Sequence, residues 1–160
     1  MGVIDIDAAP RKTNSIYPAP YDRRMAGRSS IRLGEAGGLT QFGVNIVILE
    51  PGAKSSMRHW HAHEDEFVMV TEGEVTLVQD AGPMVMLPGD CAAFPAGVED
   101  GHHFINHTGA EARFLVVGTK APREVATYPD DDLRVEITAT CAVFSRHDGT
   151  PYLPTDGDER

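Results

Sequence analysis

The stretch PGAKSSMRHWHAHEDEFVMVTEG, from Pro51 to Gly73, decides the fold and holds the candidate site. Its central part, HWHAHEDEF, places three histidines and three carboxylates in nine positions. Imidazole and carboxylate groups are the side chains that bind divalent transition metals. The apolar run that follows ends at a glycine, which is typical of a strand and its turn. The stretch therefore predicts a metal site that is built on β-strands.

The same strand pattern continues on both sides, from Ile31 to about Thr119. Short runs such as NIVILEPG, EVTLVQDAG and ARFLVVG are rich in Val, Ile, Leu or Phe, and Gly or Pro closes each of them. Strands of this length with frequent turn signals are typical of a sandwich or barrel. No long stretch keeps the 3.6-residue period of an amphipathic helix. We therefore predict an all-β protein.

The 160 residues suffice for one domain with short arms. Residues 1–30 are rich in Pro, Ala and Arg, and we expect them to form an irregular N-terminal arm. Residues 31–122 hold the predicted barrel. Residues 123–160 form a C-terminal extension, in which RVEITATCAVFS predicts one or two strands before an irregular, acid-rich tail.

Composition excludes several classes of partner. The net charge of −10 argues against nucleic acid, which is bound through clustered Lys and Arg, and against anionic membrane surfaces. No signal peptide and no apolar stretch long enough to span a bilayer is visible, so we predict a cytoplasmic protein. Cys91 and Cys141 match no zinc-binding spacing. We expect two buried free thiols, with a disulfide between them as the alternative.

The spacing of the first histidines favours a strand that presents them together. His59 and His61 are two residues apart, so on a strand both imidazoles point to one face and Trp60 points to the other. Glu66 has the wrong parity for one unbroken strand. A turn at AHED would let Glu66 open a new strand and return its carboxylate to the imidazoles.

A second histidine pair, His102 and His103, follows in GHHFINHTG. Neighbouring residues on a strand face opposite sides, so only one of the two can enter the site. Either one would complete a set of three imidazoles and one carboxylate. Such a nitrogen and oxygen set suits Fe, Mn, Co, Ni or Zn, and does not suit Ca or a soft-thiolate metal.

These residues resemble the two motifs of the cupin superfamily. The first motif is matched by Gly52, His59, His61, Glu66 and Gly73. The second is matched by Gly89, Pro95, Gly97, His102 and Asn106. The usual spacing of the second motif would place its histidine at Asp100. Counting back from Asn106 favours His102 instead, because Phe104 and Asn106 then share its face, and His103 is the alternative.

The resemblance covers roughly residues 39–119 and implies a double-stranded β-helix, a small jelly-roll barrel. It implies a divalent transition metal, in the mouth of the barrel, held by His59, His61, Glu66 and His102. The chain is similar to small single-domain type-2 cupins, including some assigned as sugar-phosphate isomerases. A fold alone does not establish a reaction.

The implied function is that of a metalloenzyme that acts on a small oxygen-rich metabolite, resembling a sugar phosphate or a carboxylate, through Lewis-acid activation. The alternatives are an iron-dependent dioxygenase and a binding or sensing protein without turnover. His63 is a candidate general base because of the ordinary pKa of imidazole, with a surface or supporting role as its alternative. Asn106 either orients a ligand or ends a strand. We expect a homodimer, because jelly-roll edges are open to pairing.

Overall fold

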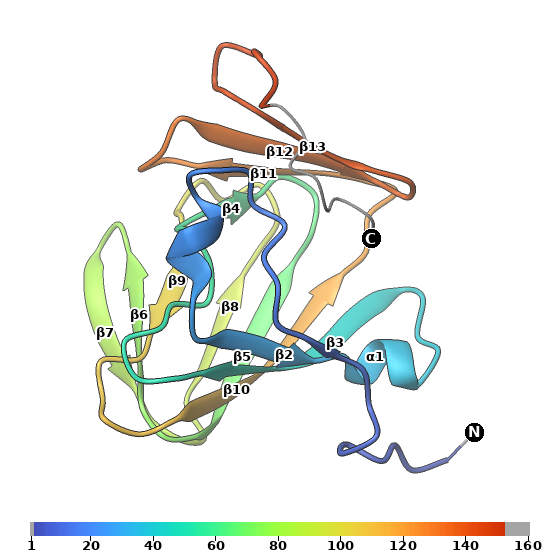
Figure 1. The fold of residues 1–160 in the computed structure, drawn as a ribbon, viewed down its shortest axis with the longest axis vertical. Coiled ribbons are helices and arrows are strands. Elements are labelled where there is room, and N and C mark those ends of the chain that lie inside the picture. Colours follow the sequence, from blue (N-terminus) through green and yellow to red (C-terminus); the bar gives the residue numbers. More distant parts are fainter. Residues whose placement is uncertain (1, 153–160) are drawn as a thin grey trace.

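Antiparallel sheets make up nearly all the regular structure in the computed structural model, which describes residues 2–152 (Figure 1). The largest sheet has the order β1 (Arg11–Lys12), β2 (Arg28–Ile31), β3 (Phe42–Leu49), β10 (Ala112–Thr119), β5 (Glu66–Glu72) and β8 (Cys91–Phe94). A three-stranded sheet has the order β7 (Gly82–Met86), β6 (Val75–Gln79) and β9 (His103–Ile105). A four-stranded sheet has the order β13 (Ala142–Ser145), β12 (Leu133–Thr138), β11 (Arg123–Tyr128) and β4 (Trp60–His61). The all-β prediction is confirmed.

The two helices in residues 2–152 are short: η1 (Asp22–Met25) is a 3-10 turn, and α1 (Leu33–Ala36) is a single α-helical turn. Neither of them is long and apolar enough to cross a membrane.

Strands β3 and β10 form the centre of the largest sheet. Both are rich in β-branched and aromatic residues, which suit a pleated and half-buried surface. They pair without a break, from Ala112 opposite Leu49 to Thr119 opposite Phe42. The other edge of β10 pairs with β5, where Gly118 lies opposite Glu66. This pairing fixes the start of β5 and therefore the place of the Glu66 carboxylate.

The main core lies between the largest and the three-stranded sheets, because its buried side chains come from both: Val47, Leu49, Ala53, Val68, Val70, Val75, Leu77, Met86, Phe94, Phe104, Ala112 and Phe114. A second core joins the four-stranded sheet to the N-terminal segment. It contains Tyr21, Met25, Met57, Ala126, Tyr128, Leu133, Val135 and Phe144. The N-terminal segment and strands β11 to β13 therefore pack together beside Met57.

Several details differ from the sequence-based expectations. RVEITATCAVFS folds as β12 and β13, and β11 precedes them as a further strand of the extension. Short strands β1 and β2 lie at least partly within the predicted N-terminal arm. Cys91 and Cys141 are free, but both are exposed, so the prediction of buried thiols was wrong. Cys91 starts a strand at the edge of its sheet, and Cys141 lies in the turn between β12 and β13. Met1 and residues 153–160 of the predicted irregular tail lie outside the described residues.

Candidate metal centre

Backbone pairing brings the two histidine segments together. The His102 amide donates to the His59 carbonyl at 2.8 Å, and the His59 amide donates back to the His102 carbonyl at 3.2 Å. Side chains of directly opposite residues lie on the same face of a sheet. His61 follows in β4, where it lies opposite Ala126 of β11, and Glu66 opens β5 after the turn.

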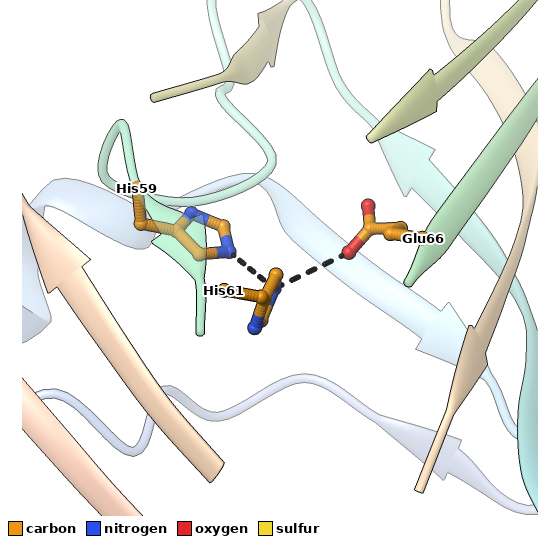
Figure 2. A group of neighbouring side chains, drawn as sticks. All are labelled: His59, His61 and Glu66. Atoms are coloured by element: carbon orange, nitrogen blue, oxygen red, sulfur yellow. Dashed lines mark hydrogen bonds and ion pairs between the residues drawn. The ribbon is translucent and has the colours of Figure 1, made fainter. Parts of the chain in front are cut away.

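The structure brings the side chains of His59, His61, Glu66 and His102 into one cluster. The Nε2 atoms of His59 and His61 are 3.1 Å apart, and His61 Nε2 lies 3.5 Å from Glu66 Oε2 (Figure 2). His102 Nε2 lies 3.7 Å from Glu66 Oε1. Two nitrogens bound at right angles to one ion, each at about 2.1 Å, lie about 3 Å apart. His59, His61 and Glu66 thus have the geometry of a possible metal site.

The hydrogen bonding of the imidazoles also fits a metal ion. In the tautomer that protonates His59 Nδ1, this atom donates to the Met57 carbonyl at 2.9 Å and leaves the Nε2 lone pair facing His61. His102 is only 2% exposed, and neither of its ring nitrogens has a hydrogen-bond partner. Buried polar atoms without partners are costly, and coordination through Nε2, the nitrogen beside Glu66, would satisfy one of the two.

Electrostatics prepare His59 and Glu66 for coordination, whereas His61 must lose a proton to bind a metal. Burial, together with the nearby His61 and His102, lowers the pKa of His59 to about 3. Burial alone would raise the pKa of Glu66, but the neighbouring imidazoles of His102 and His61 outweigh it and hold that pKa below its ordinary value. Burial likewise lowers the pKa of His61, yet Glu124 and Glu66 outweigh it and raise the pKa to about 9. A neutral His59 and an ionised Glu66 are ready to bind a cation.

Aromatic packing holds two of the imidazole rings in place. The ring of Phe94, at the end of β8, stacks on His102 with centroids 3.6 Å apart and planes 7° apart. The ring of Tyr128, from β11, stacks on His59 at 5.5 Å. Both aromatic residues are buried, so the imidazoles have little freedom to turn.

The structure separates the alternatives that the sequence left open. His102 lies beside Glu66, whereas His103 Nδ1 lies 3.2 Å from the Ser56 carbonyl. His63 has a side chain that is 53% exposed and lies 3.9 Å from Glu124. It does not line the cavity beside the cluster, so it is not placed as a general base there.

Glu124 of β11 is a site residue that the sequence analysis missed. It is 1% exposed, and it accepts hydrogen bonds from the amides of Ala62 at 2.8 Å and His63 at 3.0 Å. Its Oε1 atom lies 3.6 Å from His61 Nδ1, the ring nitrogen that faces away from Glu66. Strand parity could have indicated that Glu124 is buried, because it shares a strand face with the apolar Ala126 and Tyr128.

A cavity of about 340 Å³ extends from the histidine cluster toward the N-terminal segment. Polar side chains along it include Ser30, Asn45, Ser55 and Ser56. This volume is at the small end of the range for ligand pockets, so it suits a small metabolite.

Comparisons with known proteins agree with this architecture. Residues 45–118 match the cupin domain family. Protein SchB of Streptomyces halstedii is 30% identical over 129 residues, which cover 79% of this chain and 90% of SchB.

Two solved structures extend the likeness. A sugar phosphate isomerase from a cupin superfamily of Silicibacter pomeroyi has a TM-score of 0.93 and 56% identity, over 95% of this chain and 97% of that one. The polyketide cyclase RemF of Streptomyces resistomycificus has a TM-score of 0.59 and 25% identity, over 74% of this chain and 79% of that one. The predicted jelly-roll barrel is confirmed, and the chain belongs to the cupin superfamily.

Proposed function

We propose that this cupin binds one divalent transition metal through His59, His61, Glu66 and His102, and that it acts on a small oxygen-rich metabolite as an isomerase. The observation that carries the proposal is the convergence of three imidazoles and one carboxylate in the lining of the cavity. The likeness to the sugar phosphate isomerase from Silicibacter pomeroyi supports the reaction class.

The bound ion would supply Lewis-acid polarisation of a substrate carbonyl. The protein supplies position and surroundings. The Met57 carbonyl fixes the tautomer of His59, and Glu124 supports the turn that carries His61. Phe94 and Phe104 make the wall beside His102 apolar, which strengthens electrostatic interactions with bound substrate.

Metal loading followed by a substrate screen tests the proposal. Metal-free protein is offered Mn, Fe, Co, Ni or Zn singly, and bound metal is measured after dialysis. We expect one ion per chain, and interconversion of aldose and ketose phosphates that is visible by NMR. Protein that retains no ion would contradict the proposal. Oxygen consumption by the iron-loaded protein, without isomerisation, would favour the dioxygenase alternative.

The Glu124→Gln variant is expected to bind Zn about 10–100-fold more weakly, as is usual when a carboxylate behind a metal-binding histidine is lost. The amide cannot offer His61 Nδ1 a charged acceptor. Calorimetric titration with Zn measures the change, and Glu136→Gln, at an exposed carboxylate paired with Arg123, is the control. Equal Zn affinity in Glu124→Gln and the parent protein would show that Glu124 only supports the turn.

A further inference from the structure

Three cations line the cavity beside the histidine cluster. Lys12, Arg28 and Arg32 all line it, whereas Glu66 is the only carboxylate among its described lining residues. This local excess of positive charge contrasts with the net charge of −10 for the whole chain. A cleft lined by one sign of charge concentrates ligands of the opposite sign.

Arg28 is the central cation of this group. It lies in β2 opposite Leu49 of β3, and its Nε–H donates to the Ser55 carbonyl at 2.8 Å. Within residues 2–152, no carboxylate lies within ion-pair distance of its guanidinium group, and its terminal nitrogens make no hydrogen bond. Figure 1 shows β2 beside β3. Strand β5, which starts at Glu66, belongs to the same sheet.

The surroundings of Arg28 increase its need for an anion. It is partly buried, and burial followed by the nearby Arg32 lowers its pKa, against the opposing effects of Tyr17 and Glu66. Guanidinium nevertheless stays protonated in proteins. A partly buried charge without an anionic partner is unfavourable, and here the terminal nitrogens belong to a residue that lines the cavity. A ligand anion is the partner that the geometry allows.

We propose that Arg28, assisted by Lys12 and Arg32, forms an oxyanion subsite in this cavity. The ligand class is a small molecule with a phosphate or carboxylate at one end and a carbonyl or hydroxyl oxygen at the other. The guanidinium fork matches such an oxyanion in two parallel hydrogen bonds. The opposite end of the ligand then lies toward the histidine cluster, and this second part rests on the proposed function.

Other side chains along the cavity fit a polyhydroxylated ligand. Ser30, Asn45, Ser55 and Ser56 line the cavity and offer hydroxyl and amide groups. Val47 and Phe114 provide apolar surface beside them. A few polar groups on an otherwise apolar wall are what orient a small metabolite in its pocket.

Titration with simple oxyanions tests the subsite without knowledge of the substrate. Inorganic phosphate and acetate are titrated separately into metal-free protein, and binding is followed by calorimetry. We expect binding of at least one anion, weakened about 10–100-fold in Arg28→Gln because charge-assisted hydrogen bonds are lost. Arg28→Lys keeps the charge without the fork and should lie between the two. The stronger of the two anions identifies the ligand as a phosphate or a carboxylate.

Controls separate this inference from folding defects and from the metal site. Arg113→Gln changes an exposed arginine that pairs with Glu72 and Glu111, and it should bind anions as the parent protein does. If Arg28→Gln does not fold, Arg28→Lys and Arg32→Gln decide the result. Unchanged anion affinity in folded Arg28 variants, or no anion binding by the parent protein, overturns the subsite. Anion binding that depends on Arg28 in protein that takes up no metal would support the subsite and contradict the proposed function.

Discussion

The Glu66→Gln variant is expected to bind divalent metal at least about a hundredfold more weakly. This loss of affinity is larger than the one expected for Glu124→Gln, because Glu124 only supports a proposed ligand. Glu66 is the only carboxylate in the proposed ligand set, and its two oxygens face His61 and His102 separately. An amide removes the negative charge and offers only a weak oxygen donor. The absorption spectrum of Co²⁺ added to metal-free protein measures the change.

A matched control for this variant lies on the same strand. Glu72→Gln, at the other end of β5, changes an exposed carboxylate that pairs with Arg113, and it should bind Co²⁺ normally. Metal should also raise the thermal stability of the parent protein and of Glu72→Gln, because a ligand that binds only the folded state stabilises it. A Glu66→Gln protein with the parent Co²⁺ spectrum and affinity would remove Glu66 from the site.

Asn106→Ala is expected to lower the free energy of unfolding by about 2–6 kcal/mol, since two acceptors would each lose a buried donor at about 1–3 kcal/mol. Asn106 is 0% exposed, and its amide nitrogen donates to the carbonyls of Leu49 at 2.9 Å and Ala110 at 2.7 Å. Its Oδ1 accepts from the amide and the hydroxyl of Thr108. Unfolding in urea at equilibrium measures the loss.

The Asn106 prediction also decides between the two roles that the sequence left open. Its contacts are to backbone and to Thr108, and it does not line the cavity, so folded Asn106→Ala should keep the metal affinity of the parent protein. Thr108→Val removes only the hydroxyl and should cost no more than about 1.5 kcal/mol. Reduced metal binding by folded Asn106→Ala would instead support a role in orienting a ligand.

Local rules explain why so much of the histidine cluster could be predicted from the sequence. Strand parity places His59 and His61 together, and the odd spacing of Glu66 requires the turn that the structure contains. Parity could not decide between His102 and His103, because adjacent residues always face opposite sides. The choice depends on which of them pairs with His59, and that pairing is tertiary.

The remaining site residues could not be predicted because distant segments deliver them. Glu124 reaches His61 only because β11 pairs with β4, and Arg28 reaches the cavity only because β2 pairs with β3. Neither residue belongs to a local motif. Asp130 shows the same limitation, because it forms an ion pair with Arg58, which is far from it in the sequence. Assembly as a homodimer and a cytoplasmic location stay predictions.

The pairing of β4 with β11 determines which segments are needed to transfer this site to another protein. The segment that matches the cupin domain family ends at residue 118 and contains all four proposed ligands, yet Glu124 and Tyr128 come later in the chain. A protein that kept only residues 45–118 would contain the four proposed ligands but would lack Glu124 and Tyr128, which orient two of the histidines. Transplanting this centre into another protein therefore requires the trailing strand as well as the histidine motifs.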